Sequence, residues 1–122
     1  MQIEVLPQAL TVCKLKDIRD LDLARPFYFI GRTDEELSLV CETEHAPEDT
    51  LGREDGWRGF RIVGTLDFSL VGILAKLSGL LAQANIGIFA VSTYNTDYIL
   101  VKAENLEGAI RALSEGGYEI VE

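Results

Sequence analysis

The chain has 122 residues, 48% hydrophobic and 25% charged, a composition that suits one packed domain or two small fused ones rather than a disordered segment. The net charge of −9 and the scattered Lys and Arg residues argue against binding nucleic acid or an anionic membrane through general electrostatics. No apolar run approaches the ~20 residues that span a bilayer, and MQIEVLPQAL lacks the features of a secretory signal. We therefore expect a cytoplasmic protein that contacts neither nucleic acid nor membrane.

The first half of the chain contains three strand-like runs. They are ALTVCKL, PFYFIG and ELSLVCET, and the acidic DIRDLDLAR between the first two predicts a short helix or a loop. EHAPEDTLGREDG is rich in charge, proline and glycine, which indicates a linker. We interpret residues 1–56 as a degenerate copy of the second half with shortened helices, plus this linker. No sequence repeat proves a duplication.

The chemically reactive side chains of the first half form no recognised motif. Cys13 and Cys41 lie in apolar runs and share neither a CxxC motif nor metal-ligand spacing. Reduced core thiols are the preferred interpretation, with a disulfide or a reactive thiol as alternatives. His45 has acidic neighbours in CETEHAPED, which would allow a metal site, but a solvated acidic loop is preferred. We predict no metal and no cofactor.

Residues 57–122 have a clearer pattern. They begin with WRGFRIV, which is rich in β-forming residues. From Val71 to Ala84 the apolar residues recur at three- and four-residue spacings, which predicts a helix with one buried face. Asp67 and Ser69 precede this helix and can cap its free amides.

The remaining elements follow in IFAVSTYNTDYILV, where two apolar runs flank a polar insert and predict a strand pair. A second helix is expected from about Glu104 to Glu115, ended by Gly116 and Gly117, and YEIV is the last strand. The order strand, helix, strand, strand, helix, strand predicts a ferredoxin-like α+β fold, βαββαβ, with an antiparallel sheet and both helices on one face.

Two segments of residues 57–122 resemble the ACT domain, a small-molecule-sensing module of amino-acid metabolism. DFSLVGILAKLSGLLAQANIGI is similar to the family's D-x-P-G-[IL]-[LIV] entry to its first helix, although one extra residue separates Asp67 from Gly72 and Val71 stands at the usual proline. AVSTYNTDYILV is similar to the ACT units of cytosolic arginine sensors, of their free-standing bacterial relatives and of aspartate kinases. The first half resembles the family only in layout, which implies two fused ACT-like units.

The resemblance implies a regulatory protein without enzymatic activity that binds an amino acid between ACT units. Leu70 stands where the arginine sensors place an acidic residue, so arginine itself is not implied as the ligand. The implied ligand-binding residues are Asp67, Phe68, Ser69, Leu70, Val71, Gly72, Ile73, Leu74, Ser92, Thr93, Tyr94 and Asp97.

These residue types suit a free amino acid on physical grounds. The first helical turn offers unpaired N–H groups and a positive dipole end to a carboxylate, and Gly72 lets a ligand approach that backbone. Asp97 can accept hydrogen bonds from an ammonium group. The plainer alternatives are helix capping by Asp67 and Ser69, helix–sheet packing at Gly72 and an ordinary turn at Asp97.

Three functions compete on the sequence alone. The leading one is an amino-acid sensor that acts on an unknown protein partner, because paired ligand-type loops occur without a catalytic constellation. The second is a non-catalytic dimerisation or interaction module with a decayed ligand site, and the third is a small enzyme of the wider ferredoxin-like class. A homodimer is expected, although two units within one chain would also permit a monomer.

Overall fold

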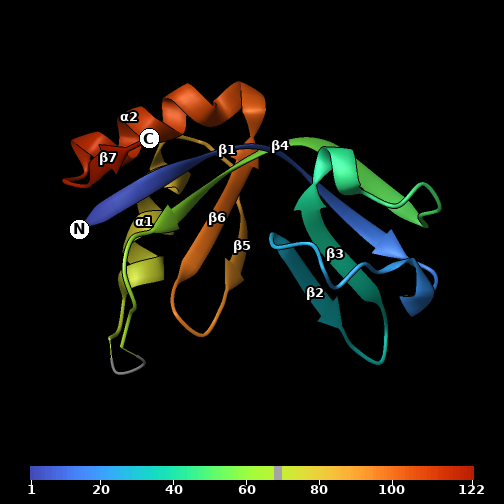
Figure 1. Cartoon of the computed structure of the whole chain (residues 1–122). Coiled ribbons are helices and arrows are strands. Elements are labelled where there is room, and N and C mark those ends of the chain that lie inside the picture. Colours follow the sequence, from blue (N-terminus) through green and yellow to red (C-terminus); the bar gives the residue numbers. More distant parts are fainter. Residues whose placement is uncertain (68–69) are drawn as a thin grey trace. The chain divides into compact units, whose positions relative to one another are not determined.

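The computed structural model describes residues 1–67 and 70–122. It shows an α+β chain with antiparallel strand pairs, as the sequence predicts (Figure 1). Within this described part of the chain, no helix has both the length and the hydrophobicity that crossing a membrane requires. The elements are β1 (Gln2–Leu15), β2 (Tyr28–Arg32), β3 (Leu37–Glu42), β4 (Gly52–Ile62), α1 (Ile73–Gln83), β5 (Phe89–Ser92), β6 (Asp97–Lys102), α2 (Leu106–Glu115) and β7 (Glu119–Val121).

The chain divides into two compact units. The larger unit consists of Met1–Pro7 and Arg58–Glu122, and the smaller unit is the continuous segment Gln8–Trp57. β1 and β4 each contribute residues to both units. The sequence assigned residues 1–7 to the first half, whereas in the structure they group with the second.

The start of β1 belongs to the larger unit because its side chains lie in that unit's core. Ile3 and Val5 are buried there, and the Val63 amide donates to the Gln2 carbonyl (3.0 Å). β7 pairs with the same stretch in parallel. The sequence pattern predicts a later start for this strand, in ALTVCKL, because Pro7 interrupts the run and a proline weakens a strand signal.

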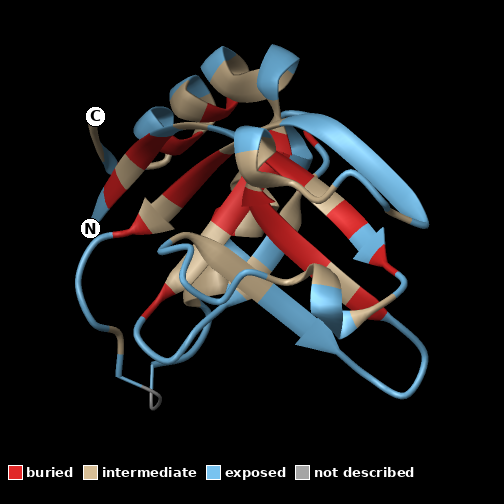
Figure 2. Ribbon diagram, turned by 45° about the vertical axis from the view of Figure 1, so that its right-hand side comes forward, coloured by how far each residue is buried: buried red, intermediate tan, exposed pale blue. Residues whose placement is uncertain are grey.

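Both helices of the larger unit pack on one face of its strands. Alternate residues of β1, β4 and β6 belong to this core, and Figure 2 shows buried residues in red. The apolar faces predicted for the two helices supply the rest of the core. The buried cluster is Ile3, Val5, Phe60, Ile62, Leu77, Leu81, Ile86, Ile99, Val101, Ala109, Leu113 and Tyr118.

The first helix begins later than the sequence predicts. Its N-cap is Gly72, whose φ of 79° favours glycine, so the helix starts at Ile73. The expectation that Asp67 caps the helix is wrong, because Asp67 precedes the N-cap by five residues and its carbonyl accepts from the Leu70 amide (3.0 Å). Ser69, the other expected cap, lies outside the described residues. Helix–sheet packing does not require the glycine, because an added Cβ at Gly72 meets no atom within 4 Å.

α1 ends at Gln83, two residues before Asn85. This residue adopts a positive φ of 61°, and the next amide, of Ile86, donates back to the Leu81 carbonyl (2.9 Å). Ile86 and Leu81 are both buried, so the chain reversal that ends the helix also joins the core.

The end of α2 repeats this arrangement with glycine. Gly117 has a φ of 101°, and the Tyr118 amide donates to the Leu113 carbonyl (3.1 Å). The prediction that Gly116 and Gly117 terminate the helix is confirmed.

Replacing Gly116 by alanine is expected to destabilise the larger unit by about 1–2 kcal/mol. An added Cβ would overlap Leu80 Cδ1 and lie 3.0 Å from Leu80 Cδ2, so the two helices would have to move apart or Leu80 would have to change rotamer. Gly79→Ala is the matched control, because a Cβ there meets no atom within 4 Å and alanine favours a helix. Urea unfolding followed by far-UV circular dichroism measures both variants, and equal stability of Gly116→Ala and the wild type would contradict this packing argument.

The smaller unit is built on the antiparallel strands β1, β3 and β2. Its register sets Leu15 opposite Leu37 and Cys13 opposite Leu39, which places these side chains on one face with Cys41. The acidic segment after β1 forms a single 3₁₀ turn, Ile18–Asp20, with its preceding residue Asp17 as the cap.

Both cysteines of the smaller unit are free, buried thiols, as the preferred interpretation holds. Burial, together with the neighbouring Cys13, raises the pKa of Cys41 to about 11. Burial also raises the pKa of Cys13. Each folded thiol therefore keeps its proton at a pH where the same thiol in the unfolded chain loses it.

The free energy of unfolding of the smaller unit is therefore expected to fall as the pH rises from about 9 to about 11. Below that window both states hold the proton and the thiols contribute no pH dependence. Cys41→Ala removes one such group, so its stability should fall less steeply over the same window than that of the wild type. Urea unfolding monitored by Trp57 fluorescence at several pH values gives the two slopes, and equal slopes would contradict the assignment.

β4 begins inside EHAPEDTLGREDG, the segment whose composition predicts a linker. Its first five residues are exposed and largely charged, so they carry no alternating apolar signal. The backbone nevertheless pairs, since the Leu51 amide donates to the Lys14 carbonyl (2.8 Å) just before the strand. Arg53 Nε also binds Asp55 Oδ1 (2.8 Å) along it.

The two units contain matching hairpins, β2–β3 and β5–β6, each followed by a 3₁₀ turn. Equivalent residues lie 60 positions apart in the sequence. In each connecting turn a threonine amide donates to the carbonyl three residues later, from Thr33 to Glu36 and from Thr93 to Thr96, both at 2.9 Å. The same threonine hydroxyls accept the returning amides at 3.2 and 3.4 Å. The repetition thus includes the backbone geometry of the turn and its threonine.

Candidate functional site

The β5–β6 turn of the larger unit is anchored to the segment that follows β4. The Thr96 hydroxyl donates to the Ile62 carbonyl (2.7 Å), and the Leu66 amide donates to the Asn95 carbonyl (2.6 Å). Thr96 is only 7% exposed, so its hydroxyl is a buried group with its partner in place. These two bonds hold the turn beside the segment that leads into α1.

The N-terminus of α1 lies on the other side of the same space. Its first intrahelical bond runs from the Lys76 amide to the Gly72 carbonyl (2.9 Å), so the amides of Ile73, Leu74 and Ala75 precede the helical ladder. Together with the positive end of the helix dipole, these amides can receive a carboxylate.

Between them is a depression of about 330 Å³, called here the turn–helix depression. Most of the residues that the resemblance implied are brought together around it. Val71 is not among its lining residues and is 90% exposed, and Phe68 and Ser69 lie outside the described residues. The lining residues are Leu66, Asp67, Leu70, Gly72, Ile73, Leu74, Ala75, Ser92, Thr93, Tyr94, Asn95, Thr96 and Asp97.

Four lining residues are not among the ligand-binding residues that the resemblance implied. They are Leu66, Ala75, Asn95 and Thr96. Ala75 follows the expected stretch directly, and Asn95 and Thr96 lie inside the polar insert STYNTD, so their position in the sequence could have indicated them. Leu66 has no such signal, because only its bond to the turn brings it to the site.

The charge around the turn–helix depression is acidic. Asp97 is half-buried and accepts a hydrogen bond from the Ser92 hydroxyl (2.6 Å), which orients the carboxylate. Asp67 is the second acidic lining residue, and the described lining contains no Lys or Arg. The remaining wall combines aliphatic side chains with hydroxyl and amide side chains. The arrangement can therefore offer a carboxylate to an ammonium group, backbone amides to a carboxylate and apolar contact to a side chain.

Comparison with known proteins places this geometry in a family, since a model described as the ACT domain matches residues 52–115. The chain belongs to the ACT domain family. The matched residues include the turn–helix depression and both helices. ACT domains are regulatory modules.

Among curated relatives, the chain is similar to the cytosolic arginine sensor for mTORC1 subunit 1 of Bos taurus and of Homo sapiens. Each is 40% identical over 84 residues, which cover 63% of this chain and 26% of the sensor. The chain thus spans about a quarter of the length of these relatives.

Among solved structures, a protein from Agrobacterium tumefaciens has a TM-score of 0.84 and 29% identity, covering 98% of this chain and 91% of that one. A protein of unknown function from Vibrio cholerae has a TM-score of 0.73 and 25% identity over 94% and 88% of the two chains. The regulatory subunit of aspartate kinase from Thermus thermophilus shares the fold at 12% identity, with a TM-score of 0.68 over 96% and 97%.

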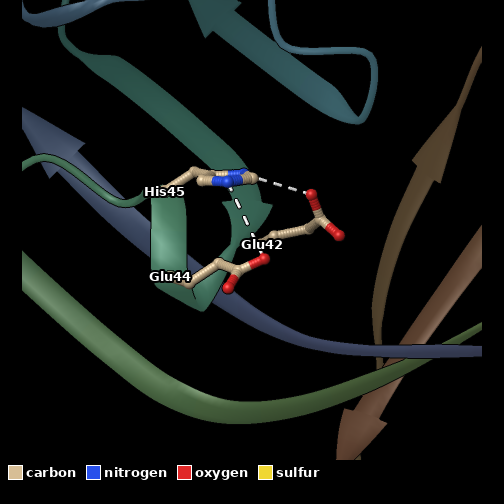
Figure 3. A group of neighbouring side chains, drawn as sticks. All are labelled: Glu42, Glu44 and His45. Atoms are coloured by element: carbon tan, nitrogen blue, oxygen red, sulfur yellow. Dashed lines mark ion pairs between the residues drawn. The ribbon is translucent and has the colours of Figure 1, made fainter.

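One group of metal-ligating side chains occurs in the described part of this ACT-family chain, outside the turn–helix depression. Glu42, Glu44 and His45 present ligand atoms within 4.8 Å of one another (Figure 3). His45 Nδ1 lies 3.2 Å from Glu42, and Nε2 lies 3.7 Å from Glu44. The two carboxylates thus face different ring nitrogens of the His45 imidazole.

Proposed function

We propose that this chain is a non-enzymatic, cytoplasmic ACT protein that binds a free amino acid and regulates a partner through it. The turn–helix depression carries the proposal, because it sets the Asp97 carboxylate and the first amides of α1 around one space of amino-acid size. The ammonium of the ligand would bind Asp97, and its carboxylate would bind the amides of Ile73 and Leu74. Thr93 and Tyr94 would contact the rest of the molecule.

The lining favours a neutral or basic amino acid over an acidic one. A ligand with a side-chain carboxylate would meet Asp67 and Asp97, and the described lining offers no Lys or Arg to balance them. The aliphatic wall of Leu70, Ile73 and Leu74 would contact a side chain of moderate size. The relatives named for arginine sensing are consistent with an amino-acid ligand.

Our proposal includes two fused ACT-like units of ferredoxin-like ancestry, the smaller one degenerate. The matching hairpins support it, since Thr33 and Thr93 make the same two bonds in their turns and lie 60 positions apart. The larger unit supports a ferredoxin-like origin with its order of β4, α1, β5, β6, α2 and β7. In the smaller unit a 3₁₀ turn stands where the larger unit has its first helix.

A thermal-shift screen of the proteinogenic amino acids tests the binding function. An amino acid at 100 times its dissociation constant should stabilise the larger unit by about 2.7 kcal/mol, which raises Tm by several degrees. N-acetyl and amide derivatives of the best amino acid are the matched controls, because each lacks one of the two charges. No stabilisation by any amino acid, or equal stabilisation by the derivatives, would refute the proposal.

A second candidate, an interaction module with a decayed ligand site, is favoured by the apolar rim of the depression. Leu70 and Tyr94 line the depression and are 51% and 79% exposed, and Val71 beside Leu70 is 90% exposed. A homodimer that buries this rim would explain the exposure under either function. Light scattering with and without the amino acid distinguishes the sensor from the interaction module. A sensor whose ligand lies between two copies dimerises more tightly when the ligand is present, because ligand binding and dimerisation are thermodynamically linked. A decayed module dimerises equally in both conditions.

A further inference from the structure

The group of Glu42, Glu44 and His45 lies within the smaller unit, Gln8–Trp57, and is called here the His45 cluster. It stands where β3 ends. Glu42 is the last residue of that strand, and Glu44 and His45 belong to the 3₁₀ turn that follows it (Figure 3). His45 is the only histidine of the chain. The cluster thus joins the single imidazole of the protein to two carboxylates.

Two of the three side chains in the His45 cluster are largely withdrawn from solvent. The side chains of Glu42 and His45 are 21% and 26% exposed, whereas that of Glu44 is 76% exposed. A polar group that leaves water needs a partner to replace it. This partial burial favours a defined site, which is the alternative to a solvated acidic loop that the sequence left open.

The 3₁₀ turn that carries the His45 cluster is fixed to the body of the smaller unit. The hydroxyls of Thr11 and Thr43 form a hydrogen bond of 2.9 Å, and Thr11 is completely buried. The Ala46 amide donates to the Thr43 carbonyl (3.2 Å), and Ala46 packs against the buried face that contains both cysteines. The turn therefore holds its side chains on a backbone that is already in place before an ion arrives.

The two ring nitrogens of His45 differ in their distance from the carboxylates. Nδ1 lies 3.2 Å from Glu42 Oε2, at the upper end of the range for a hydrogen bond, and Nε2 lies 3.7 Å from Glu44 Oε1, which is too long for one. Around a tetrahedral Zn²⁺ ion bound at its usual distances, neighbouring ligand atoms lie roughly 3.3–3.6 Å apart. The Nε2 side thus has the wider separation that a shared ion requires, and the exposed Glu44 can close the small remainder.

The corresponding turn of the larger unit has the same backbone but different side chains. It is the 3₁₀ turn Ala103–Asn105, 60 positions later. The residues that precede the two turns have nearly equal dihedral angles, φ −63° and ψ 137° at Glu42 and φ −62° and ψ 142° at Lys102. Glu42 and His45 correspond to Lys102 and Asn105, so the cluster does not follow from the shared hairpin. The larger unit therefore supplies an internal control.

We propose that the His45 cluster binds a divalent transition-metal ion such as Zn²⁺ through His45 Nε2 and the Glu44 carboxylate. Glu42 accepts the Nδ1 proton, which fixes the ring orientation and the tautomer that leaves Nε2 free to bind. Two protein ligands leave further positions to water or to a donor atom of another molecule. An imidazole ligand favours such ions over Mg²⁺ and Ca²⁺, which prefer oxygen. The inference does not depend on an amino-acid ligand in the larger unit.

Isothermal titration of the full chain with ZnCl₂ in a metal-free, non-coordinating buffer tests the proposal. Zn²⁺ should bind, and an excess of Mg²⁺ should not compete. His45→Gln should abolish the binding. Glu42→Gln should weaken it by roughly 10- to 100-fold, as expected for loss of the group that orients a metal-binding histidine. Glu104→Gln, which removes the carboxylate at the position equivalent to Glu44 in the larger unit, is the matched control and should bind as the wild type does.

NMR of the ring nitrogens distinguishes the role of Glu42 from that of Glu44. Because His45 is the only histidine, its imidazole signals are unambiguous. Zn²⁺ should shift the Nε2 resonance and leave Nδ1 protonated. The proposal is overturned by absence of Zn²⁺ binding at millimolar concentration, by binding that His45→Gln retains, by coordination through Nδ1, or by equal losses in Glu42→Gln and Glu104→Gln, which would make the effect one of net charge.

Discussion

Asp97→Asn is expected to weaken binding of the amino acid found in the thermal-shift screen by roughly 10- to 100-fold. The substitution keeps the size and the shape of the side chain but removes the charge that would pair with the ligand ammonium. The Ser92 hydroxyl, which donates to Asp97 Oδ1 at 2.6 Å, can still donate to the amide oxygen. The fold should therefore survive, and the loss should come from the ligand contact.

Titration calorimetry at two salt concentrations measures this effect. The matched control is Glu104→Gln, which removes one exposed carboxylate from the 3₁₀ turn after β6, away from the residues that line the turn–helix depression. It should bind as the wild type does. If both variants lose affinity equally, the effect is one of net charge, and Asp97 has no direct role.

Leu81→Ala is expected to destabilise the larger unit by about 2–5 kcal/mol, the largest effect on stability expected here. Leu81 has no exposed surface and packs among both helices and the strands. Its backbone also accepts the Ile86 amide that closes α1 (2.9 Å). A cavity there would loosen the helix that presents Gly72 to the turn–helix depression, so ligand-induced stabilisation should shrink as well.

Urea unfolding followed by far-UV circular dichroism is the appropriate measurement, because both described α-helices belong to the larger unit. Leu23→Ala, at a position that is 76% exposed, is the control and should change stability by less than about 0.5 kcal/mol. A Leu81→Ala loss as small as the control's would mean that the core around α1 collapses to fill the space.

The helices could be predicted closely because their signals are local. Apolar spacing identified Leu77 and Leu81 as core residues, and Asn85 and Gly117 end their helices through their own backbone preferences. The exact start of α1 was not predictable in this way, since the choice between a cap at Asp67 and a left-handed Gly72 depends on the path of the preceding loop.

The strands were harder because pairing is a non-local property. The charged start of β4 and the stretch of β1 around Pro7 lack the pattern of a buried strand, yet both pair with neighbours from distant parts of the sequence. The same limit applies to the candidate site. The motif containing Thr93 and Asp97 is visible in the sequence, but the burial of Thr96 against the Ile62 carbonyl exists only after folding.

The division of the chain into two units also affects the order in which they can fold during synthesis. On the ribosome, the continuous segment 8–57 is complete before most of residues 58–122 have been made, so it can fold first. Residues 1–7 can pack in their core only after the segment 8–57 and much of residues 58–122 have been synthesised. Contacts between residues so far apart in the sequence slow folding. Expression of residues 58–122 alone would thus yield a product without Ile3 and Val5. A design that isolates this half must supply residues 1–7 through a crossover linker after Glu122, because this stretch pairs with β7 in parallel.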